Sequence, residues 1–368
     1  MPIEGRVKFE VGGAFYNPES QIVRELGVLA AGVYRRDRGQ LRVLDAMAGC
    51  GVRSLRYWTE SEADWVLTND GNPDLGEILR SNLAETIAAG RGQVTHQNAD
   101  RLFCTCYGDR DYYDLIDIDS FGSPTPYLST ALRAAKIGGL LYLTNTDGRT
   151  TTGHLPENSL RVYGAYARAH PAAREQGLRL AIGAAQQQAA SLGLGIQPIF
   201  ALVSGQSDRA MVRVLPKSRL SSQNYGFLGY CHACGEYQIV PWRKLGRTTC
   251  PREGGSLTVS GPMWLGTLHD RAELSKMQVL ARSWNWDKPL ELLALMTAEI
   301  DFPPYFYTLG EIGRRGKLDI PKRSRLLNAL QDRGYRACAT SLHPSAVKTD
   351  ATLETCIAIA HSLQSAKF

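Results

Sequence analysis

Residues 41–51 read LRVLDAMAGCG, an apolar run that ends in an acid and passes into a loop of small residues. The apolar positions before Asp45 are typical of a buried strand, and glycines at 49 and 51 let the backbone approach a ligand closely. Residues 52–60, VRSLRYWTE, then begin a helix. A strand, a small-residue loop and a helix in this order are the opening unit of a doubly wound α/β fold.

The same alternation of strand and helix continues along the chain. Further strand-like stretches are ADWVLTNDGNP (63–73), QVTHQNADRLF (93–103), YYDLIDID (112–119) and GGLLYLTNT (138–146). We expect a capped amphipathic helix from Asn17 onward, before the first strand, and another helix over residues 171–192. Two later stretches, GIQPIFALVS (195–204) and RAMVRVLP (209–216), are expected to pair as a hairpin. The sequence therefore predicts a parallel, Rossmann-like sheet with an antiparallel hairpin at its edge.

The chain divides into three parts by composition. Residues 1–216 contain the predicted sheet, and residues 217–262 are rich in glycine, cysteine and turn residues, which indicates a small knuckle. In residues 263–368 helical patterns return, together with one strand-like stretch, GYRACATSLHP. We expect this last part to be a smaller α+β domain.

The composition is that of a folded protein, because 43% of the 368 residues are hydrophobic and 21% are charged. No apolar stretch reaches the length of a membrane span and no apolar signal core is found, so we expect a cytoplasmic protein. The net charge of +6 is small, but residues 310–336 hold eight basic residues against three acids. This segment indicates either contact with a phosphate backbone or an ordinary solvated face.

Three features collect where the first three predicted strands end, which is where open α/β sheets bind ligands. Gly49 lies in the small-residue loop, Asp70 ends the second strand, and Asn98-Ala99 follows the third. A carboxylate at the second strand end can hold both hydroxyls of a ribose, and a polar side chain at the third can meet an adenine amine. This spacing is typical of class I methyltransferases that use S-adenosylmethionine, and it is not that of G-x-G-x-x-G or Walker A loops.

The fourth strand ends in DIDSFGSP (117–124). Asp119 can accept a hydrogen bond from an exocyclic amine, whose lone pair is delocalised into its ring and is therefore a poor nucleophile. Phe121 offers a face for stacking, and Gly122 allows a tight loop against the ring. The alternative is that Asp119 caps the helix that follows. Asp117 lies one pleat earlier and is expected to share the face of Asp119.

Seven stretches resemble one family in order from end to end: AFYNPESQIVRE (14–25), LDAMAGCGVRSLRY (44–57), NDGNP (69–73), DIDSFGSP (117–124), TNTDG (144–148), GPMWLGTLHD (261–270) and GYRACATSLHPSAVKTDA (334–351). The chain resembles the tRNA (guanine-26, N2) dimethyltransferases. The resemblance implies S-adenosylmethionine-dependent methylation of the N2 amine of a guanine in tRNA.

The resemblance also assigns roles to single positions of this chain. It implies that the cofactor is bound by Arg24, Gly49, Arg53, Asp70, Asn98 and Ala99. It implies that Asp119 is catalytic and that Phe121, with Gly122, forms the guanine pocket. The cysteine knuckle and the basic C-terminal domain together suit a role in docking tRNA, in which phosphate contacts position the substrate. Two positions depart from the family pattern: Ser120 replaces a usual proline, and Asn98 replaces a usual aspartate.

The predicted knuckle contains Cys231-His-Ala-Cys234 and Cys250-Pro-Arg-Glu253. Two C-x-x-C pairs would form a zinc ribbon, since structural Zn²⁺ is normally closed by four ligands. Here three thiols, Cys231, Cys234 and Cys250, are candidate zinc ligands, with Glu253 or His232 as a substitute for the fourth. The alternative is a site that no longer binds metal.

Two other functions remain open from the residues alone. One is amine methylation of adenine in DNA or of a protein side chain, which an Asp-aromatic loop also serves. The other is an RNA-binding protein whose methyltransferase domain is degenerate. No feature of the sequence indicates an obligate protein partner.

Overall fold

The computed structural model describes residues 1–365, which form two compact units. The first, here called the sheet unit, consists of Met1–Thr146, Ala185–Arg219 and Asp270–Leu293. The second, here called the knuckle unit, consists of Asp147–Ala184, Leu220–His269 and the chain from Ala294 onward. The three consecutive domains expected from the sequence stay a prediction, whereas the two compact units are interleaved along the chain.

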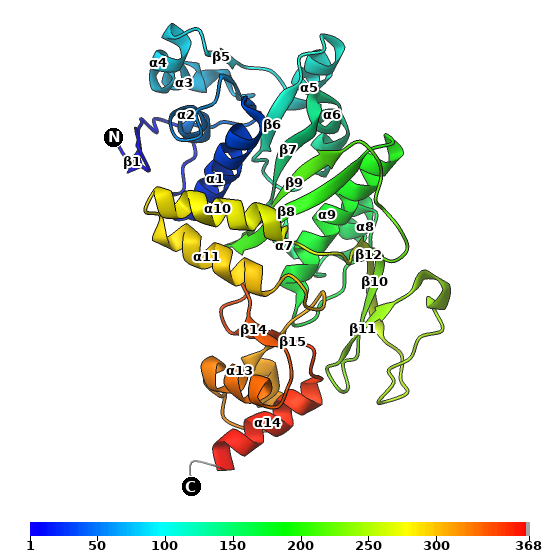
Figure 1. Ribbon diagram of the computed structural model, residues 1–368. Coiled ribbons are helices and arrows are strands. Elements are labelled where there is room, and N and C mark those ends of the chain that lie inside the picture. Colours follow the sequence, from blue (N-terminus) through cyan, green and yellow to red (C-terminus); the bar gives the residue numbers. More distant parts are fainter. Residues whose placement is uncertain (366–368) are drawn as a thin grey trace. The chain divides into compact units, whose positions relative to one another are not determined.

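A seven-stranded sheet forms the core of the sheet unit, in the order β5-β4-β3-β6-β7-β9-β8 (Figure 1). Its strands are β3 (Arg42–Asp45), β4 (Trp65–Asn69), β5 (Gly92–Thr95), β6 (Tyr113–Ile118), β7 (Ala135–Asn145), β8 (Gly195–Ser204) and β9 (Ser207–Leu215). The first five run parallel, and β9 pairs antiparallel with both β7 and β8. The predicted doubly wound sheet with an edge hairpin is confirmed.

Strand and helix order brings the carboxyl ends of β3, β4 and β6 to one edge of the sheet, where the predicted site residues lie. All six residues of β6 are buried, as expected for a central parallel strand. The prediction was wrong beyond Thr95, because Asn98 caps the helix that starts at Ala99 and the third strand ends earlier.

Helices cover both faces of this sheet. They are α1 (Gln21–Arg38), α2 (Val52–Thr59), α3 (Gly76–Asn82), α4 (Ala84–Ala88), α5 (Ala99–Gly108), α6 (Leu128–Ala134) and α10 (Arg271–Ser283). As predicted, Asn17 caps the turn that leads into α1, through a hydrogen bond of 3.0 Å from the Glu19 N–H. In Figure 1, α1 and α10 lie side by side on one side of the sheet, and α5 and α6 lie on the other.

The first residues of the chain are fixed to the sheet unit by a buried ion-pair network. Glu4 ends β1 (Ile3–Glu4), which pairs with β2 (Val7–Lys8), and its side chain is only 1% exposed. Its carboxylate accepts from Arg24 at 2.5 Å and from Arg56 at 2.7 Å. The Tyr16 hydroxyl donates to it at 2.9 Å. This network therefore anchors the loop that precedes α1.

The knuckle unit contains two three-stranded antiparallel sheets. The first, in the order β11-β10-β12, consists of β10 (Tyr225–Tyr230), β11 (Tyr237–Val240) and β12 (Thr258–Trp264). The second, in the order β13-β15-β14, consists of β13 (Tyr307–Thr308), β14 (Ala337–Ala339) and β15 (Ala346–Thr349). Helices of this unit are α7 (Gly148–Thr151), α8 (Pro156–Tyr163), α12 (Leu309–Gly316), α13 (Arg323–Asp332) and α14 (Leu353–Ser365). The predicted C-terminal α+β region is confirmed.

Two helices contribute residues to both units, namely α9 (Ala173–Ser191) and α11 (Asp287–Ala298). The Ala- and Gln-rich stretch was predicted to be helical, and α9 confirms it.

Among residues 1–365, no helix combines the length and the apolar character that a membrane crossing requires.

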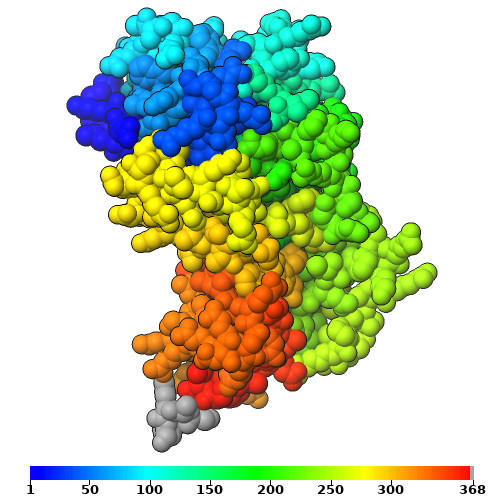
Figure 2. All heavy atoms as spheres, viewed as in Figure 1, coloured from blue at the N-terminus to red at the C-terminus, as the bar shows by residue number. Residues whose placement is uncertain are grey.

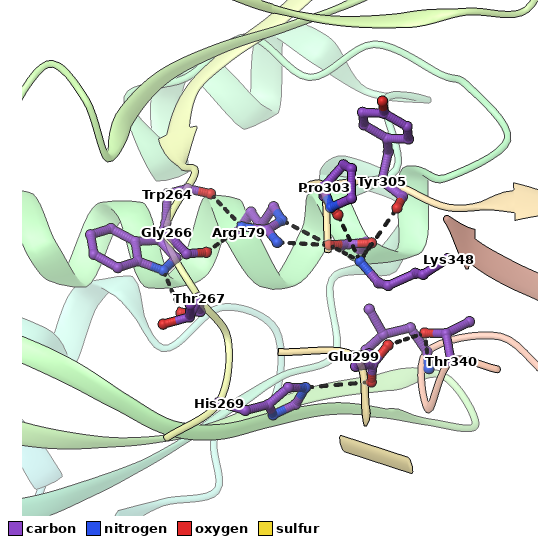
Figure 3. A network of polar contacts seen from close by, with 12 residues as sticks. Arg179, Trp264, Gly266, Thr267, His269, Glu299, Pro303, Tyr305, Thr340 and Lys348 are labelled. Carbon is purple, nitrogen blue, oxygen red and sulfur yellow. Dashed lines mark hydrogen bonds and ion pairs between the residues drawn. The ribbon is translucent and has the colours of Figure 1, made fainter. Parts of the chain in front are cut away.

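Charged residues are buried in the middle of the knuckle unit (Figure 3). Lys348 donates to both carboxylate oxygens of Glu175 at 2.8 Å, and Arg179 donates to the same carboxylate at 2.8 Å. Glu299 accepts from Thr340 and lies 3.4 Å from the His269 ring nitrogen. These groups join α9, the end of β12 and the strands near the carboxyl terminus, and each buried charge has a partner, as stability requires.

Candidate active site

The small-residue loop after β3 is tied directly to the acid that ends β4. The Gly49 N–H donates to Asp70 Oδ2 at 2.8 Å, and the Asn72 N–H donates to Asp70 Oδ1 at 2.9 Å. Gly49 and Gly51 have φ values of 56° and 78°, a region that glycine adopts without strain. The structure thus brings Gly49 and Asp70 together, as the strand order predicts.

Asn98 and Ala99 lie at the amino end of α5. The Asn98 side-chain oxygen accepts from the Arg101 N–H at 3.2 Å and so caps the helix. That oxygen keeps a second lone pair and can still accept a hydrogen bond from a ligand, and the amide nitrogen can donate one. Asn69 holds the neighbouring loops in register, because its amide nitrogen donates to Ala46 O at 2.9 Å and to Gln97 O at 3.0 Å.

Asp119 lies directly after β6 and is held by two guanidinium groups. Arg53 reaches its Oδ2 at 2.9 Å, and Arg209 reaches its Oδ1 at 3.0 Å. Arg53 also contacts Asp117 at 3.1 Å, so the two acids share one face as predicted. The Arg53 and Arg209 side chains are only 5% and 6% exposed, whereas Asp119 is 28% exposed. Asp119 is therefore the most exposed of these three side chains.

The electrostatics of the three acids differ. Burial alone would raise the pKa of Asp119, but the charges of Arg53 and Arg209 hold it well below its usual range. Burial and, after it, the neighbouring Asp117 carboxylate raise the pKa of Asp45 to about 8. Burial also raises the pKa of Asp117, against the charge of Arg53. The lowered pKa keeps Asp119 ionised at neutral pH, so it is a hydrogen-bond acceptor rather than a strong base.

Two large aromatic side chains lie exposed beside this carboxylate loop. Phe121 is 82% exposed and Phe15 is 72% exposed, and their ring centroids are 5.8 Å apart at an interplanar angle of 69°. Exposed rings in contact with each other offer a stacking surface for a flat ligand. Sequence analysis predicted Phe121 but did not assign a role to Phe15.

The loop that carries Phe121 is fastened to the end of β7. The Gly122 N–H donates to Thr146 Oγ1 at 2.7 Å, and the Thr146 N–H donates to Gly122 O at 2.8 Å. Gly122 has φ of 76°, which explains the glycine. Ser120 is 4% exposed, and its hydroxyl makes a long contact of 3.5 Å to Thr144 O. The serine is therefore packed in place although it replaces the usual proline.

The alternative role of Asp119 as a helix cap is not observed. The turn Thr125–Tyr127 follows Pro124, and α6 follows Tyr127, and neither has a side-chain cap. Ser123 instead accepts from the Thr125 N–H at 3.2 Å within the loop. The carboxylate of Asp119 is directed to its two arginine partners.

Arg24 is buried in the network around Glu4. Its hydrogen bonds go to the Glu4 carboxylate, at 2.5 Å and 2.7 Å, and to Asn17 O at 3.1 Å. These contacts fix the loop that carries Phe15, so Arg24 supports the site indirectly, through the position of this loop. Its predicted contact with a cofactor stays a prediction.

Three more residues of this group were missed by sequence analysis. The Tyr57 hydroxyl donates to Asp117 at 2.7 Å, and Arg53 stacks on the Tyr142 ring at 5.4 Å. Arg209 is the third, on β9. A basic residue in a largely apolar strand is a weak indication of function, and only the position of β9 beside β7 places Arg209 at Asp119. The exposed Phe15, in contrast, lies within the AFYNP stretch that carries the family resemblance.

A second candidate site lies in the knuckle unit. The sulfur atoms of Cys231, Cys234 and Cys250 all lie within 4.8 Å of one another, and those of Cys234 and Cys250 are 3.5 Å apart. Within the described chain, this is the one group of its kind, and it includes neither His232 nor Glu253. The Glu253 side chain instead lies 3.6 Å from Arg252.

The two halves of this site have the same backbone turn. The Gly235 N–H donates to Cys231 O, and the Gly254 N–H donates to Cys250 O, each at 2.8 Å. Both glycines have positive φ, of 84° and 68°. Because Glu253 precedes Gly254 as Cys234 precedes Gly235, it occupies the position equivalent to the fourth cysteine.

The active-site donors fit a nucleoside ligand. One carboxylate oxygen each of Asp45 and Asp117 is buried without a hydrogen-bond partner in the structure, at the edge of the sheet where Asp70 and the Gly49 loop lie. Buried polar atoms without partners are rare in proteins and are common where a ligand binds. The arrangement provides a carboxylate next to a glycine loop, and a partly exposed anion near two aromatic rings.

Comparisons with known proteins agree with this geometry. The family model for N2,N2-dimethylguanosine tRNA methyltransferase matches residues 5–361. A tRNA (guanine(26)-N(2))-dimethyltransferase of Pyrococcus abyssi is 30% identical, over 95% of this chain and 93% of the relative. One of Pyrococcus horikoshii is 31% identical, over 93% of this chain and 91% of the relative. The solved structure of Pyrococcus horikoshii Trm1 with S-adenosyl-L-methionine has a TM-score of 0.84 at 30% identity, covering 97% of this chain and 98% of that one.

Proposed function

Because this chain belongs to the N2,N2-dimethylguanosine tRNA methyltransferase family, we propose that it methylates the N2 amine of guanine 26 in tRNA with S-adenosylmethionine. The products are N2-methylguanine and N2,N2-dimethylguanine. The observation that carries the proposal is a partly exposed anion, Asp119, held by two buried arginines, in the loop that carries Phe121, whose exposed ring contacts that of Phe15.

The chemistry of Asp119 follows from its charge. A guanine N2 amine shares its lone pair with the ring, so attack requires that the amine turn out of conjugation. A carboxylate that accepts one N–H of the amine orients it and favours the positive charge that develops on nitrogen. A methylated, positively charged aryl amine is strongly acidic, so its proton is lost without a strong base. An anion with a low pKa is therefore sufficient.

The cofactor would lie along the carboxyl edge of the sheet. S-adenosylmethionine supplies an electrophilic methyl group when it is bound. Asp70 would accept both ribose hydroxyls, and the Gly49 loop allows close approach of the backbone. Asn98 and Ala99 would face the adenine, and Arg24 and Arg53 would meet the carboxylate of the methionine part. Arg53 also orients Asp119, so it links the cofactor to the acceptor amine.

The guanine would be held between aromatic rings. A base inside an RNA helix has to leave its stack to reach an enzyme's reacting groups. Phe15 and Phe121 are exposed and in contact, and stacking on them offsets the lost stacking in the RNA. Gly122 leaves room in the loop for the base edge.

We also infer that Cys231, Cys234 and Cys250 bind Zn²⁺, with Glu253 or His232 as the fourth ligand. Three sulfur atoms from two equivalent turns are close enough for one tetrahedral ion. The bound metal would fasten the two turns together. Measurement of the zinc content of the purified protein tests this. A zinc content far below one ion per chain would contradict it.

The cytoplasm is the proposed location. All eight cysteines are free thiols in the structure, as expected in a reducing compartment. This agrees with a substrate that is present there.

The experiment is methyl transfer from labelled S-adenosylmethionine to an unmodified tRNA transcript. The native protein should label it, and a transcript with adenine at position 26 should stay unlabelled. We expect Asp119→Asn to lower kcat roughly 10²- to 10⁴-fold and to retain cofactor binding. Asp109→Asn, at an exposed position after α5, is the matched control. Absence of transfer by the native protein contradicts the proposed function, whereas full activity of Asp119→Asn contradicts only the role of Asp119.

A further inference from the structure

The basic segment 310–336 offers less free charge than its sequence indicates. Five of its eight basic side chains bond within the protein: Arg314 and Arg315 to Glu311, Arg323 to Pro344 O, Arg333 to Ser362 and Arg336 to Asp350. Arg315 also donates to His232 O at 2.9 Å. Three of these charges are therefore compensated by acids, and the guanidinium groups of Arg323 and Arg333 are held by internal hydrogen bonds.

A different segment of the knuckle unit carries unpaired positive charge. Residues 241–249, here called the basic arm, connect β11 to Cys250 and contain Arg243, Lys244 and Arg247. All three side chains are exposed, and the structure gives none of them an ion pair with any residue from 1 to 365. No acid occurs between Glu236 and Glu253. The arm is therefore a local positive patch without internal compensation.

An aromatic residue lies next to these cations. Trp242 is 42% exposed, and its indole N–H donates to Tyr225 O at 2.5 Å. Its ring packs edge-on against Phe227 at 4.8 Å. The indole is thus fixed at one edge, while part of its surface remains open to solvent, beside a hollow of about 280 Å³ lined by Leu220, Ser221 and Ser222.

The arm is ordered at both ends. β11 pairs with β10 up to Val240, and the Cys250 N–H donates to Gly255 O at 2.8 Å. Within the arm, Pro241 leads into a short 3-10 turn, Trp242–Lys244. Figure 2 shows this yellow-green part of the chain at the molecular surface. Cations that are already held in place lose less conformational entropy on binding than cations on a disordered tail.

We propose that the basic arm is a second contact surface for tRNA, in which Arg243, Lys244 and Arg247 bind backbone phosphates and Trp242 packs on an exposed base or ribose. The proposal rests on the proposed function and names where that substrate is held away from Asp119. Clustered cations beside an aromatic face are the combination that single-stranded and looped RNA binds. Phosphate contacts position a nucleic acid, whereas the base pocket selects the reacting nucleotide.

The test uses the full-length protein in which Arg243, Lys244 and Arg247 are each changed to Gln. These side chains are exposed and unpaired, so the variant should fold and keep its metal and cofactor binding. The Kd for the unmodified tRNA transcript should rise tenfold or more near physiological salt, and the slope of log K against log salt should fall by roughly two to three. The kcat at saturating tRNA should stay within about twofold, because phosphate contacts act on binding.

A matched control removes three exposed positive charges from the sheet unit, with Arg36, Arg282 and Lys288 each changed to Gln. Trp242→Ala is the second test variant and should weaken tRNA binding roughly fivefold to a hundredfold. An unchanged Kd and an unchanged salt slope in the arm variant would overturn the proposal. The arm would then be a candidate surface for an acidic protein partner. Equal weakening in the control would overturn it as well, since net charge would then explain the effect. Failure of the native protein to methylate tRNA, in contrast, contradicts the proposed function itself.

Discussion

Arg209 reaches Asp119 from β9, the reversed strand, and its charge helps to keep that carboxylate ionised. We predict that Arg209→Gln lowers kcat/KM roughly tenfold to a hundredfold, the effect of one charge-assisted hydrogen bond. Without that charge the pKa of Asp119 rises, so protonation begins at a higher pH. The variant should therefore lose activity on the acid side at pH values where the native protein is unaffected. A profile of kcat/KM against pH measures this.

Arg213→Gln is the control for that variant. Arg213 lies on the same strand and pairs with Glu273 at 2.8 Å, away from Asp119. The Arg213→Gln variant should lose activity over the same acid pH range as the native protein. A parallel drop in activity at every pH in Arg209→Gln, without a shifted acid limb, would show that Arg209 has only a structural role.

The aromatic pair leads to a second prediction for single residues. Phe15→Ala and Phe121→Ala should each lower kcat/KM for tRNA roughly fivefold to a hundredfold, the value of one base stacked on one ring. Both side chains are largely exposed, so the melting temperature should change little. Leucine at either position should restore less activity than tyrosine. Equal rescue by leucine would indicate apolar contact rather than stacking.

At the level of elements, the two cysteine turns differ at the second ligand position, where Glu253 corresponds to Cys234. Glu253→Cys completes the second C-x-x-C pair on a turn that already has the required backbone. We predict that this change increases zinc affinity, because a fourth thiolate closes the tetrahedral site. Competition with a metal chelator measures the affinity. Cys231→Ser should lower it, and both variants should keep native binding of S-adenosylmethionine.

His232→Ala separates the two candidate fourth ligands. If histidine completes the site, this variant loses zinc as Cys231→Ser does, whereas Glu253→Ala does not. The His232 ring lies 4.8 Å from that of Tyr230, edge to face, so its loss also removes one aromatic contact. The change in melting temperature of the metal-loaded variant measures the loss of stability from this aromatic contact.

The elements that could be predicted from the sequence are those with strong local patterns. Asp70 and Asp119 were found because parallel strands bring their carboxyl ends to one edge, so position in the sequence implies position in space. The end of β5 was misplaced because Asn98 is as good a helix cap as a strand-end residue. Arg209 was missed because its role depends on β9 lying next to β7, and strand order is a property of the tertiary fold.

On the scale of the whole molecule, the buried acids make stability depend on pH. Burial raises the pKa of Glu299, but hydrogen bonds and charges, first of all from His269, hold it at about 2 against an ordinary value of 4.5. Because the folded pKa is the lower one, the stabilisation is complete above pH 4.5 and is lost as the pH falls towards 2. The lost free energy of unfolding is about 3 kcal/mol.

Glu299→Gln is the test of that dependence. It should be less stable than the native protein at neutral pH and should lose less stability between pH 7 and pH 3. Urea unfolding at the two pH values measures both differences. Glu354→Gln, at a side chain that is 63% exposed, is the control and should follow the native protein. An identical pH dependence in Glu299→Gln and the native protein would assign the effect to other carboxylates.

Both compact units are assembled from three separate stretches of the chain, and two helices run through the points of division. No single gene truncation can therefore deliver either unit intact, and no single protease cut can release one. A single crossover between two genes therefore cannot exchange either unit for a domain of another protein. The methyl-transferring sheet and the cysteine knuckle have to be inherited as one piece, and each can change only by substitutions that the other tolerates.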